Sequence, residues 1–338
     1  MSGRANLDDV AKAAGVSKTT ASQVMRGTGR ISEKTRKRVM RAAETLRYIP
    51  DQRAASMRSG QNREIGFLIN QIANPFNAEV ISGVCDLLEA DGYLVSVLDG
   101  RDDADRQSQQ LEAFIRNGRG GLLWVPATDT QDTVVSMLRN YRMPVVTFMR
   151  RLDHAGFDHV GTRNAEATEM ATRYLAEIGH KKIAYLGGTD MTSVRQDRIL
   201  GYTNAVGALG LGAPIVWGSL DNKIAGRDAL RALLAKHPDT TAVVCNGDMV
   251  ALGACLALID DGMVPGREVS VIGFDDIQDA AVATPPLTTL AVSPYQMGRK
   301  LARILLDRIR DPEEPVTVAE VSAELVIRST TGAPVLDA

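Results

Sequence analysis

The sequence predicts an α/β protein, in which a small N-terminal helix-turn-helix domain precedes two subdomains built on doubly wound parallel sheets. Three observations support this fold class. Residues 1–60 carry 13 Lys/Arg against 5 Asp/Glu, although the whole chain carries 39 against 41. The same segment has the cap and stop residues of three short helices. From Glu64 onward, short apolar runs alternate with amphipathic segments, which is the pattern of repeated β-α units.

Length and composition describe an ordinary globular protein with more than one domain. At 338 residues the chain suits a small domain followed by one or two larger ones. No apolar run approaches the roughly 20 residues of a membrane span, and the N-terminus lacks the apolar core of a signal peptide. We therefore expect a cytoplasmic protein with no membrane partner. Cys85, Cys245 and Cys255 form no metal-type or redox-type pair, so we expect reduced, buried thiols and no metal or cofactor.

The first two predicted helices are separated by a very short turn. Asn6 is placed to cap the first helix, with Asp8 and Asp9 in its first turn, and Gly15 follows as a left-handed stop. Ser17 then opens the second helix almost at once. So short a turn is typical of a helix-turn-helix motif rather than of a helical hairpin in a bundle.

The second and third predicted helices carry side chains that suit a nucleic acid. The second turns outward short or flexible hydrogen-bonding groups of the kind that reads base edges in the major groove: Lys18, Thr19, Thr20 and Gln23. Ser32 caps the third, whose exposed face is basic and suits phosphates: Lys34, Arg36, Lys37, Arg38 and Arg41. The alternative is a basic domain whose charges are merely solvated. The tight turn and the polar second helix favour binding to double-stranded DNA.

Three runs in this segment match a known motif set: Leu7 to Ser22, Ile31 to Arg36, and Leu46 to Pro50. They resemble the DNA-binding domain of lactose-repressor-type (LacI/GalR) transcription regulators. The resemblance implies base readout by Lys18 and Thr19, and contacts to the DNA backbone by Ser17, Thr20, Ser22, Ser32, Thr35 and Tyr48. Gln23 replaces the family's usual Arg, and Arg26 its usual Asn. Because Gln prefers adenine where Arg prefers guanine, we expect a different base at that step and an added phosphate contact from Arg26.

Residues 51–62 form a predicted hinge. Asp51 and Gly60 are suitable helix ends, but the stretch is too short to be stably helical alone. The resemblance implies that this segment folds on DNA and inserts an apolar side chain into the minor groove, here Met57, with Ala54 in register. Asp51 replaces the usual Asn and puts a carboxylate near phosphates. A flexible linker is the alternative, and Met57 and Ala54 favour the hinge helix.

Residues 63–338 contain two successive series of β-α units of similar length, which predict two parallel-sheet subdomains. The strands expected in the first series are Ile65–Ile69, Tyr93–Leu98, Gly121–Val125 and Val145–Phe148. Those expected in the second are Lys182–Leu186, Ile215–Gly218, Thr241–Cys245 and Ser270–Gly273. A final strand, Val321–Ile327, is expected to return to the second subdomain.

We expect the chain to cross between the subdomains at Thr162–Asn164, at Ala291–Ser293 and near Ala319. The predicted domains are therefore residues 1–50, 51–62 and 63–338. The last divides into a first subdomain of about 63–161 and 292–319, and a second of about 162–291 and 320–338. Because no heptad segment follows Gly332, we expect a homodimer rather than a tail-assembled tetramer.

Ligands in such sheets bind beyond the carboxyl ends of the strands, which predicts a site in the cleft between the subdomains. Further runs resemble the effector domain of the same family, which is similar to periplasmic sugar-binding proteins: Asn74–Phe76, Gly179–Ala184, Arg198–Tyr202, Asp248–Gly253, Gly273–Asp276 and Pro286–Leu290. The resemblance implies a dimer whose affinity for a pseudo-palindromic operator is controlled by a sugar or sugar derivative, as inducer or as corepressor.

Four side chains are candidates for effector binding. Phe76 offers a face to a sugar ring, Arg198 a fork for hydroxyls or a carboxylate, and Asp275 an acceptor for hydroxyl protons. A structural role is the alternative for each: core packing, an ion pair and the capping of a turn. Arg163 stands where sugar-binding relatives tend to have Asp, and Gly247 where they commonly have Asn. We therefore hypothesise an anionic effector, a sugar acid or a phosphorylated sugar, with a solvent-facing Arg163 as the alternative.

Two other classes of protein fit the sequence less well. An exported solute-binding protein conflicts with the basic N-terminal domain and with the missing signal peptide. A Rossmann-type enzyme conflicts with Asn70–Pro75, which follows the first strand where a glycine-rich phosphate fingerprint would stand. No nucleophile–base pair is evident, so we expect no enzymatic activity. Trp124 and Trp217 lie near strand ends, where core packing and ligand stacking are equal alternatives.

Overall fold

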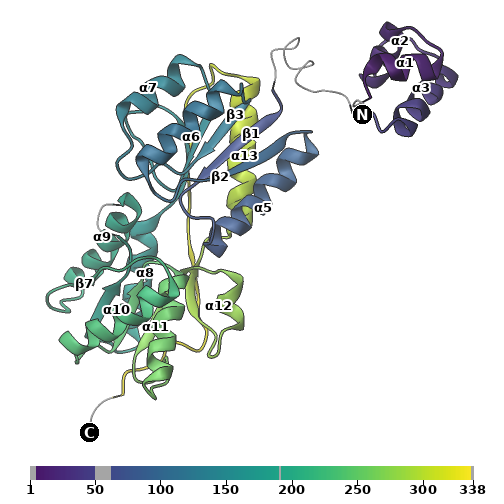
Figure 1. Ribbon diagram of the computed structural model, residues 1–338. Coiled ribbons are helices and arrows are strands. Elements are labelled where there is room, and N and C mark those ends of the chain that lie inside the picture. Colours follow the sequence, from purple (N-terminus) through teal and green to yellow (C-terminus); the bar gives the residue numbers. More distant parts are fainter. Residues whose placement is uncertain (1–4, 50–61, 190–191, 336–338) are drawn as a thin grey trace. The chain divides into compact units, whose positions relative to one another are not determined.

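The computed structural model describes residues 5–49, 62–189 and 192–335, shown in Figure 1. The chain divides into an N-terminal unit, Met1–Asn62, and a C-terminal unit, Arg63–Ala338. Most of the predicted hinge, including Ala54 and Met57, lies outside the described residues. Among the described helices, none combines the length and apolar character that crossing a membrane requires.

The N-terminal unit is a bundle of α1 (Leu7–Ala14), α2 (Lys18–Met25) and α3 (Glu33–Thr45). Asn6 caps α1 by accepting hydrogen bonds from the backbone N–H groups of Asp8 and Asp9, and Gly15 ends the helix at φ 59°. The helices bury a small shared core built on Val10, Ala21, Val24 and Val39. The predicted helix-turn-helix is therefore present.

The first subdomain contains a parallel sheet of order β11-β5-β4-β3-β1-β2. Its strands are β1 (Glu64–Ile69), β2 (Leu94–Asp99), β3 (Gly121–Trp124), β4 (Val145–Phe148), β5 (Asp158–Thr162) and β11 (Val318–Val321). Helices α5 (Pro75–Ala90) and α13 (Pro294–Arg310) share one apolar core with it, and α6 (Ala104–Arg116) and α7 (Asp132–Asn140) share another. The sheet is thus covered on both faces, as a doubly wound fold requires.

The second subdomain contains a sheet of order β12-β10-β9-β8-β6-β7, in which only β12 runs antiparallel to its neighbour. Its strands are β6 (Ile183–Leu186), β7 (Ile215–Trp217), β8 (Ala242–Cys245), β9 (Ser270–Asp275), β10 (Thr288–Ala291) and β12 (Glu324–Val326). Its helices are α8 (Asn164–Glu177), α9 (Ser193–Ala208), α10 (Lys223–Lys236), α11 (Asp248–Asp260) and α12 (Gln278–Val282).

The structure has three strands that the sequence did not suggest: β5, β10 and β11. Asp158 and His159 are buried in β5, and Thr288 and Thr289 are buried in β10, so neither strand contains a long apolar run. The last crossing between the sheets lies after Val321, because β11 stays in the first sheet. It therefore falls slightly later than the expected crossing near Ala319, and β12 is shorter than the expected strand.

Glycines allow the covering helices to pack backbone against backbone. A Cβ atom at Gly298 in α13 would lie 2.1 Å from the carbonyl oxygen of Val80 in α5, and one at Gly83 would lie 2.0 Å from the carbonyl oxygen of Tyr295. The helices α10 and α11 meet in the same way, since a Cβ at Gly253 would lie 2.1 Å from the carbonyl oxygen of Lys223. These helix pairs are therefore closely packed and cannot accept a methyl group without moving apart.

We expect Gly298→Ala to destabilise the protein by about 1–3 kcal/mol, because the added methyl group must push α13 away from α5. Gly207→Ala is the matched control, since Gly207 is also helical and a Cβ there would meet nothing within 4 Å. That control is expected to be neutral or stabilising by about 0.5–1 kcal/mol. Urea unfolding measures both changes, and equal effects of the two substitutions would contradict the packing argument.

Candidate DNA interface and ligand pocket

The outward face of α2 presents the predicted DNA-reading side chains together. Lys18 and Thr19 are exposed, and Thr20, Ser22 and Gln23 are partly exposed. The hydroxyl oxygen of Ser17 accepts a hydrogen bond from the Thr20 backbone N–H at 3.1 Å, which caps the helix. The structure therefore gives Ser17 a cap role, in addition to the predicted contact with DNA.

Several of these polar groups already have partners within the unit. The Lys18 ammonium donates to Asp8 at 2.8 Å, and Arg26 Nε donates to the Ser22 carbonyl oxygen at 3.2 Å. The Gln23 side chain lies against Gly29, with its amide carbon 3.0 Å from where a Cβ would stand. The contact with Asp8 uses one of the three donors of the Lys18 ammonium.

The remaining predicted contacts lie around α3. Ser32 caps this helix by accepting from the Thr35 backbone N–H at 3.3 Å, and its hydroxyl donates to the Thr35 hydroxyl at 3.0 Å. Tyr48 packs in part against the small core of the unit. Ser32 is exposed, while Thr35 and Tyr48 are half-buried, so these groups combine a structural role with an accessible surface.

A pocket of about 70 Å³ lies between the two subdomains of the C-terminal unit. From the first subdomain it is lined by Asn70, Gln71, Asn74, Phe76, Asn77, Val125, Met149 and Arg150. From the second it is lined by Thr192, Val194, Arg198, Asp221, Asn246, Gly247, Met249 and Asp275. Several of these residues end or directly follow strands β1, β3, β4, β8 and β9. The pocket therefore occupies the predicted place, beyond the carboxyl ends of the parallel strands.

Phe76 belongs both to the core and to the pocket. Its ring is parallel to that of Phe148, with centroids 6.1 Å apart, and only 2% of the residue is exposed. The neighbouring Asn77 is buried and donates to the Gln71 carbonyl oxygen at 2.7 Å. These contacts fix the loop after β1, so the face of Phe76 that lines the pocket is held in place.

Arg198 is the buried cation of the second wall. Its Nε donates to the Asn164 side-chain oxygen at 2.8 Å, and Nη1 donates to the carbonyl oxygen of Asn246. Its guanidinium carbon lies 3.5 Å from the centroid of the Phe274 ring, which makes a cation–π contact. Arg198 therefore lines the pocket with its orientation fixed by groups from α8, β9 and the loop after β8.

Asp275 ends β9 in a strained conformation. Its φ of 118° falls in the region that glycine favours, and 8% of the residue is exposed. Burial raises the pKa of the Asp275 carboxyl to about 7; nearby Asp221 and Glu79 act in the same direction, and Arg198 opposes them. A backbone strained at a pocket-lining carboxylate is typical of a functional position.

Two ionisable pocket residues, Asp221 and Arg150, were not predicted from the sequence. Asp221 precedes α10 and accepts a hydrogen bond from the Asn246 side-chain amide at 2.8 Å. Burial raises the pKa of the Asp221 carboxyl, although the hydrogen bond from Asn246 opposes this shift. Arg150 follows β4 and pairs with Asp102, and no motif in the sequence marked either residue.

Arg163 does not line the pocket, which corrects the expectation drawn from the sequence. Arg163 directly precedes α8, its side chain is 48% exposed, and its nearest carboxylate is Glu166 at 3.5 Å. The start of α8 turns this side chain to solvent, as the alternative interpretation held. Gly247 does line the pocket. An anionic ligand was expected because of the positive charge of Arg163, and Arg163 lies outside the pocket.

The two tryptophans have structural surroundings. Trp124 is fully buried, and its indole N–H donates to the Gln107 side-chain oxygen at 2.8 Å. Trp217 packs edge-on against His237, with ring centroids 6.5 Å apart. Neither lines the pocket. In the part of the chain that the structure describes, no group of three or more His, Cys, Asp or Glu residues could hold a metal ion.

The raised pKa of Asp275 predicts how stability depends on pH. Between the ordinary value of about 4 and the native value of about 7, the folded state binds more protons at this site than the unfolded state does. This site therefore lowers the free energy of unfolding progressively as pH rises through that window, at about 1.4 kcal/mol per unit at most. Asp275→Asn removes the effect, so its stability relative to the native chain should rise from pH 4 to 7 and then level off. Parallel profiles from urea unfolding would contradict the assignment.

Comparison with known proteins identifies both units. Residues 6–51 match the model described as bacterial regulatory proteins of the lacI family, and residues 62–329 match periplasmic binding proteins and the sugar binding domain of the LacI family. The transcriptional repressor PurR of Vibrio campbellii is 33% identical over 332 residues, covering 96% of this chain and 98% of the relative. The maltose regulon regulatory protein MalI of Escherichia coli is 30% identical over 318 residues, covering 91% and 93%.

Two solved structures of regulators share the fold of this protein over nearly the whole chain. A complex of the regulator CelR with cellobiose is 27% identical with a TM-score of 0.73, and the match covers 97% of this chain and 100% of the other. A lac repressor dimer bound to operator and an anti-inducer has the same fold, with a TM-score of 0.87 at 23% identity, covering 98% of this chain and 100% of the other. The helix-turn-helix, the two sheets and the pocket between them are those of a regulator, and the chain belongs to the LacI family of bacterial regulatory proteins.

Proposed function

We propose that this protein is a repressor that binds a pseudo-palindromic operator as a homodimer, with an affinity controlled by a small polyhydroxylated molecule. The observation that carries the proposal is the presence in one chain of an exposed polar recognition helix and a pocket lined by both sheets. The relatives PurR and MalI are named as a repressor and a regulatory protein, which supports it. Such a protein works in the cytoplasm and needs no catalytic residue.

For the DNA interface, we propose that Lys18, Thr19 and Gln23 read bases in the major groove. Their exposure on α2, with Thr20 and Ser22 beside them, supports this role. The Lys18–Asp8 ion pair is open to solvent, with side chains 63% and 50% exposed, so breaking it costs little. The exposed basic face of α3 supplies contacts to phosphates that do not depend on sequence.

For the effector, we propose a neutral sugar rather than the anion considered from the sequence. The ionisable lining residues are two arginines, Arg150 and Arg198, and two carboxylates, Asp221 and Asp275, and Asp102 pairs with Arg150 from behind, so neither sign of charge dominates the wall. Phe76 offers an apolar face, and several side-chain amides offer both donors and acceptors. The small cavity favours a small ligand, and the CelR structure with cellobiose shows a sugar bound to a related regulator.

For the dimer, we propose that apolar side chains exposed on α10, α11 and α12 form part of the interface. Ile224 is 69%, Leu256 46% and Val282 79% exposed. The three helices are neighbours, because α10 packs on α11 and the Lys223 ammonium lies 2.7 Å from Asp279 in α12. Exposed apolar groups gathered in this way mark a protein interface, and the symmetry of a dimer suits a palindromic operator.

We expect Lys18→Ala to lower the affinity for a specific operator, selected with the native chain from random duplexes, by about 5- to 150-fold. The lost base contact is worth about 1–3 kcal/mol, whereas binding to random DNA should fall much less. Lys12→Ala is the matched control, because Lys12 is an exposed lysine of α1 outside the proposed interface. Mobility-shift titrations measure the specific-to-random ratio, and an equal change for both variants would argue against readout by α2.

We expect calorimetric titration with neutral sugars, sugar acids and phosphorylated sugars to show binding of a neutral sugar. Arg198→Lys should weaken that binding at least tenfold, because lysine cannot reproduce the fixed guanidinium fork. Arg163→Lys is the matched control and should bind normally, since Arg163 lies outside the pocket. Binding of acidic ligands alone, or an equal loss in the two variants, would overturn the proposed effector class.

A further inference from the structure

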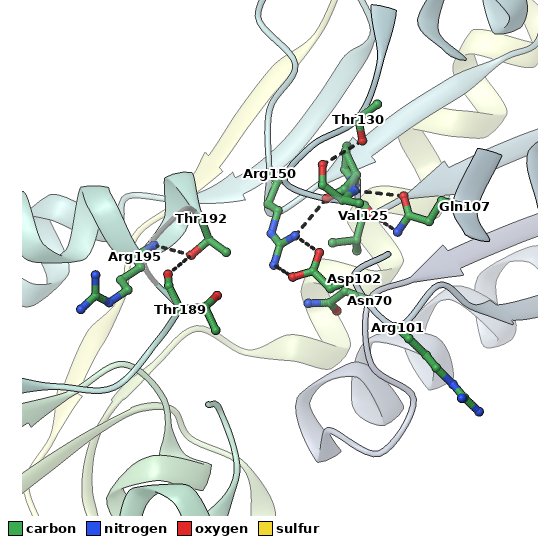
Figure 2. A network of polar contacts seen from close by, with 12 residues as sticks. Asn70, Arg101, Asp102, Gln107, Val125, Thr130, Arg150, Thr189, Thr192 and Arg195 are labelled. Atoms are coloured by element: carbon green, nitrogen blue, oxygen red, sulfur yellow. Dashed lines mark hydrogen bonds and ion pairs between the residues drawn. The ribbon is translucent and has the colours of Figure 1, made fainter. Parts of the chain in front are cut away.

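Arg150 forms an unusually complete ion pair at the edge of the pocket. Figure 2 shows its guanidinium lying against the carboxylate of Asp102, in the loop between β2 and α6. Nη2 donates to one carboxylate oxygen at 2.9 Å, and Nη1 donates to the other. Nη1 also donates to the carbonyl oxygen of Pro126 at 3.1 Å. The pairing is bidentate, and it joins three loops at the carboxyl edge of the first sheet.

Backbone strain is concentrated on both sides of this pair. Met149, directly before Arg150, has φ 59°, and Arg101 and Asp102 have φ 53° and 56°. None of these residues is a glycine, so each pays a steric cost for the left-handed conformation. Strain of this kind persists where the local geometry serves a function.

Stability does not by itself account for the pair. The Arg150 side chain is 11% and the Asp102 side chain 33% exposed, and the gain from pairing largely buried charges is mostly offset by their desolvation. The Pro126 carbonyl would still hold Arg150 in its absence. What Asp102 supplies is a negative charge on a guanidinium that lines the pocket, while Asp102 itself does not line it.

The charge matters because Arg150 is the only ionisable lining residue of the first subdomain among the residues described. On the opposite wall, the Arg198 cation is accompanied by the carboxylates of Asp221 and Asp275. Because burial raises the pKa of Asp275 to about 7, that carboxyl is partly protonated at neutral pH, and an Arg150 without its counter-ion would leave the pocket with an excess of positive charge that attracts anions. To reject anions, the pocket needs a negative charge that repels them. The carboxylate of Asp102, which is fixed behind Arg150, supplies that charge.

We propose that Asp102 is a positioning residue that neutralises Arg150, so that the pocket selects neutral polyhydroxylated ligands and rejects their carboxylate and phosphate derivatives. In this arrangement Arg150 donates hydrogen bonds to the ligand without attracting a full negative charge. The inference rests on the proposed function, in which this pocket binds the effector.

The experiment compares the native chain with Asp102→Asn, a nearly isosteric change that removes the charge. Inorganic phosphate and matched neutral, carboxylate and phosphate forms of each sugar are titrated by calorimetry. Asp102→Asn should raise the ratio of anion to neutral-ligand affinity at least tenfold, and phosphate should bind the variant at least tenfold more tightly than the native chain. Adding Arg150→Gln should remove the gain, and Asp102→Glu should restore the native ratio.

Asp153→Asn is the matched control. Asp153 pairs with Arg151 at 3.2 Å in the same subdomain, and neither residue lines the pocket, so its loss should leave the ratio unchanged. If Asp102→Asn binds phosphate and anionic sugars no better than this control, the inference is wrong even where the neutral sugar binds as proposed. If the native chain binds no neutral sugar while Asp102→Asn gains phosphate binding, the proposed effector fails and the charge role of Asp102 survives.

Discussion

The arrangement of the ligand pocket depends on the guanidinium of Arg198, which is held where three elements of the second subdomain meet. It is hydrogen-bonded to Asn164 at the start of α8 and to the carbonyl oxygen of Asn246 after β8, and it stacks on Phe274 in β9. A buried cation needs such partners, because its desolvation is costly. The same contacts place it beside Asp275, whose own burial is made tolerable by that positive charge and by partial protonation near neutral pH.

The other wall of the pocket is connected directly to the start of the C-terminal unit. Strand β1 begins at Glu64, where the segment joining the two units ends, and Asn70 at its far end lines the pocket. A strand of six residues spans about 20 Å. Phe76 lies in the first turn of α5, and α5 packs closely against α13 at Gly83 and Gly298. A ligand in the pocket therefore contacts the loop that directly follows β1, and we propose that this strand carries the effect of binding toward the DNA-binding unit.

Features that depend on residues close together in sequence, such as helix caps and strand ends, could be predicted. Features that depend on pairs of residues far apart in sequence could not. The caps Asn6, Ser17 and Ser32 act within three residues of themselves, and Phe76 and Asp275 lie at strand or helix ends that an apolar run reveals. Arg150 and Asp221 could not be recognised from the sequence, because their hydrogen-bonding partners, Asp102 and Asn246, are 48 and 25 residues away. Arg163 was expected in the pocket only from its position in the family resemblance, whereas the structure places it directly before α8 with an exposed side chain.

Occupancy of the pocket by its ligand should change the affinity of the protein for its operator. The most direct measurement is the dissociation constant for a selected operator, with the full chain free and saturated with the sugar that it binds. We predict a shift of about 5–150-fold in one direction. Arg198→Lys should lose this shift at the same sugar concentration while its sugar-free operator affinity stays unchanged. Saturating sugar that leaves the operator constant of the native chain unaltered would contradict the account.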